Sequence, residues 1–195
     1  MNQKRINIQY EIILALLNQD MHGRALSKEL GVSLSSIQRS LSLLDKDNIA
    51  SWEEIGRNKM HFLKKNKVAR VYVFMAENYK LIKLIRHYPY LGPIISDIIE
   101  KTKGCIILLF GSYAKFSARN NSDIDVFIET NDIKLKKQIE NINSRLSIQT
   151  GMFNKSSLLA KEIIRNHVIV QGMEEYYEKL GLFKENEIGG EGNTD

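Results

Sequence analysis

The feature that most constrains this chain is a run of six apolar residues, Cys105 to Phe110, which ends at Gly111-Ser112. A continuous apolar run of this length, bounded by glycine, is typical of a strand that is buried on both faces. Ten residues after Ser112 comes a segment that contains Asp123 and Asp125, with an aliphatic residue between them. The period of two in a strand places both acids on one face and the aliphatic side chains on the other. The sequence therefore predicts two buried strands, with two acids projecting together.

Asp123 and Asp125 form a candidate metal site. At a rise of about 3.3 Å per residue their α-carbons lie roughly 7 Å apart, so both carboxylates can reach one hard cation or a pair of cations. Two like charges this close are costly unless a cation neutralises them. Gly111 permits a sharp turn after the strand, and Ser112 with the next amides can donate hydrogen bonds to phosphate oxygens. With Lys115 as a cation in the same loop, these parts predict a phosphoryl-transfer site.

The segments Gly111-Ser112-Tyr113-Ala114-Lys115 and Ser122-Asp123-Ile124-Asp125 resemble the signature of the DNA polymerase beta-type nucleotidyltransferase superfamily, most closely its minimal nucleotidyltransferase members. The resemblance covers about residues 104–172. It implies that Gly111, Ser112 and Lys115 bind the nucleotide, and that Asp123 and Asp125 are catalytic and hold two magnesium ions. ATP or another nucleoside triphosphate is the implied substrate. Related members modify and neutralise HEPN-type toxins, so the resemblance also implies a protein hydroxyl as acceptor and a toxin–antitoxin setting.

Two positions depart from the family pattern. Phe116 stands where a glycine commonly follows the basic residue, which implies a bulkier loop. The family's third carboxylate usually lies on a following strand, expected here over residues 146–153, and Gln149 occupies the position predicted for it. A neutral amide cannot accept a proton. Slow catalysis, an acid supplied by a partner, and no catalysis all stay open. In the last case the chain is a DNA-binding regulator with a degenerate, nucleotide-sensing domain.

The first third of the chain predicts three short helices and a hairpin. Helices are expected over residues 6–17 and about 24–30, the second ending at Gly31, and Ser33 is a candidate N-cap for a third helix. Strand-like pieces at residues 49–54 and 59–63 are joined by a segment with Gly and Asn, which favour tight hairpins. This order resembles the winged helix-turn-helix DNA-binding fold over about residues 6–65.

The distribution of charge along the chain predicts an anionic partner for residues 1–75. Residues 1–75 hold 12 Lys and Arg against 7 Asp and Glu, whereas residues 76–195 hold 16 of each. Six residues are candidate contacts to duplex DNA, four on the outward face of the third helix and two on the wing: Ser35, Ser36, Gln38, Arg39, Arg57 and Lys59. The alternative is a dimerisation or packing module with an ordinary solvated face, and a homodimer is left open.

The predicted class is α+β, with a winged helix at residues 1–66, a helical connector at 67–103, a mixed-sheet nucleotidyltransferase-type domain at 104–183 and a disordered tail at 184–195. The single cysteine, Cys105, excludes an internal disulfide, and the four histidines have no partner at the spacing of metal ligands. The sequence shows neither a run of about 18 apolar residues nor a signal region, so we expect a cytoplasmic protein without membrane spans.

Overall fold

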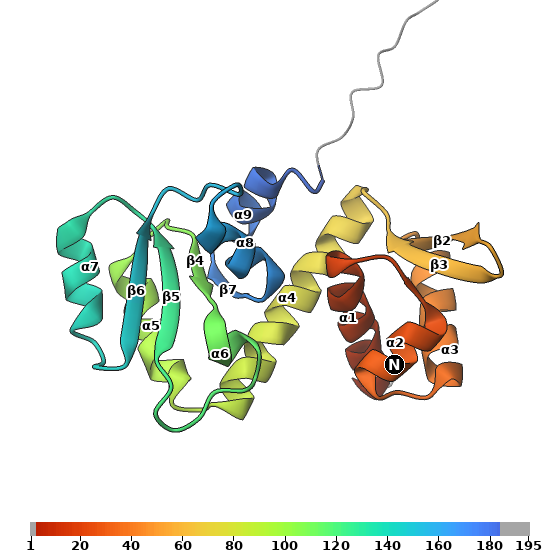
Figure 1. Ribbon diagram of the computed structural model, residues 1–195, viewed down its shortest axis with the longest axis horizontal. Coiled ribbons are helices and arrows are strands. Elements are labelled where there is room, and N and C mark those ends of the chain that lie inside the picture. Colours follow the sequence, from red (N-terminus) through yellow and green to blue (C-terminus); the bar gives the residue numbers. More distant parts are fainter. Residues whose placement is uncertain (1–2, 184–195) are drawn as a thin grey trace, which may run out of the picture.

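The computed structural model describes residues 3–183, with the backbone alone for residues 3–6. The tail predicted at residues 184–195 lies outside the described residues. Two lobes flank a long helix, α4 (Lys67–His87), which crosses the middle of the molecule (Figure 1). None of the helices within residues 3–183 combines the length and the apolar character needed to cross a bilayer.

The N-terminal lobe holds three helices and a small antiparallel sheet. Its elements are α1 (Gln3–Asn18), β1 (Met21–His22), α2 (Gly23–Leu30), α3 (Leu34–Lys46), β2 (Ala50–Ile55) and β3 (Asn58–Leu63). The strands lie in the order β1-β3-β2. The helices and the hairpin agree with the predicted order, but strand β1 was not predicted, because two residues are too short to show a period.

Local chemistry explains where these elements begin and end. Gly31 ends α2 in the left-handed conformation (φ 62°), which costs glycine no steric strain. The Ser33 side chain accepts a hydrogen bond from the Ser36 amide and caps α3, as predicted. Gly56, with φ 64°, begins the two-residue turn between β2 and β3, a geometry typical of a type II′ hairpin. These signals are local and therefore readable from the sequence.

The C-terminal lobe is a mixed sheet with helices on both faces. Its elements are α5 (Leu91–Lys101), β4 (Ile107–Leu109), α6 (Gly111–Ala114), β5 (Ile124–Glu129), α7 (Ile133–Glu140), β6 (Leu146–Gly151), α8 (Leu158–Arg165), β7 (Val168–Gln171) and α9 (Met173–Leu180). The strands lie in the order β6-β5-β4-β7. The β5–β6 pair is parallel and the other two pairs are antiparallel, so the predicted mixed sheet is confirmed.

The two faces of this sheet belong to different hydrophobic cores. One core joins the face that carries Ile107, Leu109 and Val126 to the buried side of α5. The other is continuous across α4, because Ala69, Val73 and Ala76 share it with both lobes. The helices of residues 67–103, expected as a connector, thus pack into both cores.

Candidate functional site

The backbone of Gly111 lies directly against the carboxylate of Asp125. Gly111 follows β4 and begins α6 with φ 69°, in the left-handed region that favours glycine. A Cβ built at this position would overlap Oδ2 of Asp125. The Phe110 amide donates to the carbonyl of Asp125 (2.9 Å), which fixes the two segments together. The glycine is therefore required both by its backbone conformation and by the close approach of the acid.

A buried tyrosine anchors the short helix α6, which begins at Gly111. Tyr113 is fully buried, and its hydroxyl lies 2.7 Å from that of Tyr90. Burial, together with this hydrogen bond, raises the pKa of Tyr113 to about 12. Ser112 is half-buried and Lys115 is exposed just after the helix. The amides of Gly111 and Ser112 are the first of the helix and have no intrahelical acceptor, so they can donate to an anion.

The two acids differ in their surroundings. Asp123 is exposed just before β5, whereas Asp125 is half-buried within it. Burial raises the pKa of Asp125, and the charges of Asp123 and Glu162 raise it further, while a hydrogen bond from Ser147 opposes the shift. A proton therefore competes with a cation for this carboxylate, and cation binding should weaken as the pH falls through the raised pKa.

These residues suit magnesium. Asp125 has two acidic neighbours whose repulsion a cation would relieve, and carboxylate oxygens are ligands that magnesium accepts. Within residues 3–183 no three His, Cys, Asp or Glu side chains gather as a complete metal cage. Magnesium is usually held by one or two carboxylates together with substrate phosphates, so a pair of acids is sufficient for a site that a nucleotide completes.

Gln149, the predicted third position, is not the residue directly beside Asp125. In the parallel β5–β6 pair Asp125 lies opposite Ser147, whereas Gln149 lies opposite Phe127 and is exposed. The period of two places Ser147 and Gln149 on one face but does not fix the register between strands, so the sequence does not indicate which of the two lies beside Asp125. The residue beside Asp125 is thus a serine.

The carboxylate of Glu129 binds partners other than Asp123 and Asp125. Its Oε1 accepts hydrogen bonds from the Phe153 amide and from the Lys179 ammonium, both at 2.8 Å. Glu162, on the exposed side of α8, is the further acid whose charge reaches Asp125. Glu162 was not predicted, because nothing in the sequence indicates that α8 packs near β5.

Phe116 keeps the backbone conformation that glycine favours. Its φ is 55°, although it is a bulky residue. Its ring packs at 5.9 Å from that of His87, and the Lys83 ammonium lies 5.4 Å from its centroid. Side-chain packing therefore compensates for a backbone cost of about 1–2 kcal/mol.

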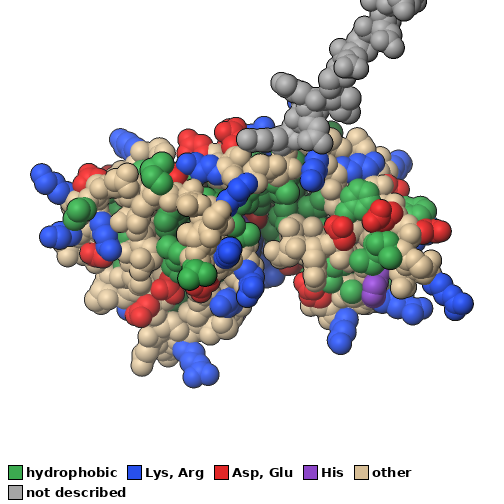
Figure 2. All heavy atoms as spheres, turned by 45° about the horizontal axis from the view of Figure 1, so that its top comes forward, with side chains coloured by type: hydrophobic (Ala, Val, Ile, Leu, Met, Phe, Trp, Pro, Cys, Tyr) green, Lys and Arg blue, Asp and Glu red, His purple; other side chains and the backbone are tan. Residues whose placement is uncertain are grey.

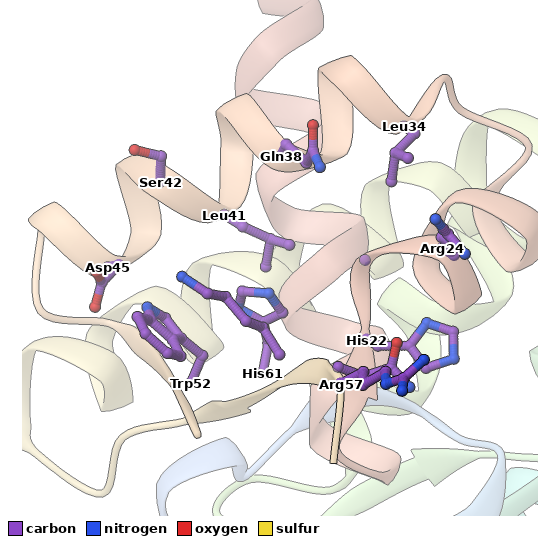
Figure 3. A pocket seen from close by; sticks show the side chains of 13 residues that line it. His22, Arg24, Leu34, Gln38, Leu41, Ser42, Asp45, Trp52, Arg57 and His61 are labelled. Atoms are coloured by element: carbon purple, nitrogen blue, oxygen red, sulfur yellow. The ribbon is translucent and has the colours of Figure 1, made fainter. Parts of the chain in front are cut away.

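A separate groove of about 660 Å³ lies in the N-terminal lobe, between α3 and the β2–β3 hairpin (Figure 3). Figure 3 shows Leu41 of α3 on one wall, with Trp52 and His61 of the hairpin facing it. The groove brings together three of the predicted DNA contacts: Gln38, Arg57 and Lys59. The other three, Ser35, Ser36 and Arg39, lie on α3 outside the groove lining.

The groove also holds residues that no sequence pattern groups together. His22, Arg24, Trp52 and His61 line it, and the Lys59 ammonium lies 3.5 Å from the centre of the Trp52 ring. Burial, and then the charge of Lys59, lowers the pKa of His61. On the face shown in Figure 2, Lys and Arg side chains project from both lobes among Asp and Glu, so this face presents mixed rather than single-sign charge.

Residues 94–175 match a family model described as polymerase beta, nucleotidyltransferase. The matched range runs from α5 to the beginning of α9 and includes Gly111, Asp123 and Asp125. No curated protein and no solved structure matches the chain. The family match supports placing this domain in the nucleotidyltransferase superfamily, in agreement with the resemblance carried by the sequence motifs.

Proposed function

We propose that the chain is a magnesium-dependent nucleotidyltransferase that takes ATP as donor and a hydroxyl of a protein, such as a HEPN-type partner, as acceptor. The observation that carries this proposal is the contact between the backbone of Gly111 and the carboxylate of Asp125. It places helix-start amides, which can donate to phosphate, beside a pair of acids that can hold a cation. The family match over residues 94–175 supports the same class of reaction.

Each part of the site has a role in this proposal. Amides of Gly111 and Ser112 donate to the nucleotide phosphates, with Lys115 as a nearby cation. Asp123 and Asp125 would hold magnesium, which when bound supplies positive charge to neutralise the phosphate oxygens. Ser147 donates a hydrogen bond that favours the ionised form of Asp125 and so keeps this ligand ready for the cation.

Mg·ATP should raise the melting temperature of the full-length protein, since a ligand that binds only the folded state stabilises it. At 100 times the dissociation constant this linkage is worth about 2.7 kcal/mol. Replacing Asp123 and Asp125 together by Asn should abolish the magnesium-dependent part of the shift. Asp97→Asn, which removes an exposed acid of α5, is the matched control and should keep the whole shift. A full shift in the double variant would place the metal elsewhere.

The serine beside Asp125, Ser147, favours a second candidate function, which is nucleotide binding without catalysis. No carboxylate stands beside Asp125 on β6, and a serine is a poor proton acceptor at neutral pH. In this alternative the domain binds the nucleotide without transferring it, and the chain is a DNA-binding regulator. Incubation with α-labelled ATP and candidate protein and RNA acceptors separates the two: label on an acceptor supports the transferase, and binding without label supports the regulator.

For the N-terminal lobe we propose a winged helix that binds duplex DNA. The order of helix, short strand, two helices and hairpin supports this proposal, as does the groove between α3 and the hairpin. The groove holds the cations of Arg24, Arg57 and Lys59 against one acid, Asp45. Its net positive charge suits the phosphate backbone, which dominates affinity for DNA.

Arg57→Ala should weaken duplex binding to all sequences alike, because a hairpin arginine on a phosphate carries no base information. The slope of log affinity against log salt should become shallower by about 0.9 if Arg57 neutralises one phosphate. Arg39→Ala should also relax sequence preference if Arg39 reads a base. Lys134→Ala, the same change of charge on exposed α7, is the control. Fluorescence anisotropy of the full-length protein measures all three, and no duplex binding at low salt would contradict the DNA-binding proposal.

A further inference from the structure

The central helix α4 has apolar side chains on two opposite faces. One face, which includes Ala69 and Val73, is buried in the core that both lobes share (Figure 1). Four large apolar side chains of the other face are between 44% and 56% exposed: Val68, Val71, Met75 and Ile82. A helix that is apolar on opposite faces is typically covered on both, and exposed apolar patches mark interaction sites. The second face of α4 is therefore a candidate docking surface.

The exposed residues follow the heptad spacing of a coiled coil. Steps of three, four, three and four residues separate the five members of what we call the α4 stripe: Val68, Val71, Met75, Asn78 and Ile82. At 3.6 residues per turn these positions lie within an arc of about 80°, opposite the buried Val73. A rise of about 1.5 Å per residue gives the stripe a length of about 21 Å. A straight apolar stripe of four turns fits the apolar side of another helix.

Asn78 is the polar member of the α4 stripe. It is exposed, and its Nδ2 donates to the Phe74 carbonyl of the same helix (2.9 Å). This bond uses one amide hydrogen, so the side chain can still donate and accept across an interface. A single polar residue within a heptad seam fixes the register of the two helices. We therefore expect a polar side chain opposite Asn78 on the partner.

Cations border the α4 stripe at both of its ends. Lys67 lies one turn before Val71, and Arg86 lies one turn after Ile82. Both basic side chains belong to exposed residues. The one acid within α4, Glu77, is buried on the other side of the helix. The exposed border that α4 itself supplies is therefore positive.

Two acids of neighbouring helices pair with other cations of α4. Glu11 of α1 lies 2.5 Å from the Lys83 ammonium, and Glu174 of α9 lies 3.7 Å from the guanidinium of Arg70. Among residues 3–183, Arg86 forms no ion pair. The charge left beside the stripe is complementary to acidic side chains.

We propose that the α4 stripe binds an amphipathic helix of another protein, one with apolar residues at heptad spacing and acids beside them. A second copy of this chain fits less well. Two parallel α4 helices would bring Arg86 against Arg86, and two antiparallel ones would bring it against Lys67, so like charges repel in either direction. Residues 184–195 contain a single large apolar residue, Ile188, and cannot fill four apolar positions. The proposal does not depend on nucleotidyl transfer.

Fluorescence anisotropy of the full-length protein tests the proposal with two labelled peptides. Each peptide has three heptads, with Leu at the a and d positions except for one Asn. The acidic peptide has Glu at the e and g positions, and the basic peptide has Lys there. The acidic peptide should bind saturably, and the basic peptide at least about tenfold more weakly, because its charges oppose those of α4. No saturable binding of the acidic peptide, or equal affinities for the two peptides, would overturn the proposal.

Val71→Gln/Met75→Gln removes two apolar anchors from the middle of the stripe. It should weaken the acidic peptide at least about tenfold. The matched control is Ile133→Gln/Leu158→Gln, since these two apolar residues are 71% and 85% exposed on other helices, and it should keep the affinity. Sedimentation velocity should give the same oligomeric state for the original chain and the stripe variant. A dimer that this variant dissociates would show that a second copy covers the stripe, and would overturn the proposal.

Arg86→Gln tests the charge. It should weaken the acidic peptide about twofold to fivefold, the range of an exposed ion pair, whereas Lys134→Gln on exposed α7 should not. If the double stripe variant melts early, Ile82→Gln at the far end of the stripe decides instead. Unchanged affinity in a folded stripe variant, or an equal loss in the control variant, would refute the proposal.

Discussion

Ser147→Asp is expected to increase nucleotidyl transfer by roughly a hundred- to ten-thousandfold, which is the contribution of a positioned general base. Ser147 lies opposite Asp125 in the parallel β5–β6 pair and already hydrogen-bonds to it. A carboxylate there would stand where it could accept the proton of an attacking hydroxyl and complete the metal ligands. The measurement is the initial rate of label transfer from α-labelled ATP at saturating magnesium.

Two matched variants separate charge from position. Ser147→Asn has the size of Ser147→Asp without its charge and should give no increase. Gln149→Asp carries the charge two residues further along β6, roughly 6.6 Å away, at an exposed position opposite Phe127, and should also give none. No transfer in Ser147→Asp, with Mg·ATP still bound, would favour the nucleotide-sensing regulator. A faster rate in Gln149→Asp than in Ser147→Asp would show that the register does not decide the third position.

Gly111→Ala is expected to abolish the magnesium-dependent stabilisation by ATP. The new methyl group would overlap Oδ2 of Asp125, so either the α6 backbone or the carboxylate must move. A displacement of about 1 Å at a reacting centre can cost about a hundredfold in rate. Thermal melts with and without Mg·ATP measure the first effect, and label transfer measures the second.

Gly104→Ala is the control for backbone strain. Gly104 has a similar left-handed conformation (φ 78°), but a Cβ there meets nothing within 4 Å. The backbone strain therefore costs about 1–2 kcal/mol in both variants, and the Gly111 variant alone disturbs the acid. If both variants respond equally weakly to Mg·ATP, backbone strain and not the contact with Asp125 explains the effect.

Much of the fold was readable because its signals are local. The cap at Ser33, the left-handed Gly31 and the alternation around Asp125 depend on neighbours within a few residues, and each predicts an element that the structure contains. Gly111 and the acid pair were also predicted, because a turn residue and an alternating strand place chemical groups without knowledge of distant contacts. Strand β1 is too short to carry such a signal, whereas α8 begins at a Ser157 cap and α9 ends at the left-handed Gly181, local signals of the same kind that were not predicted.

The pattern of residues along the chain indicates the kind of chemistry: a glycine turn, two acids on one strand face and a basic first third. The tertiary structure alone decided which residues meet across elements. It placed Ser147 rather than Gln149 beside Asp125, since register depends on how β5 and β6 pair and not on the period of either strand. It also buried Glu77 with His167, 90 positions apart in the chain, because α4 packs on both lobes at once. Residues so distant along the chain meet only after the helices and strands have packed, so no local sequence pattern predicts their contact.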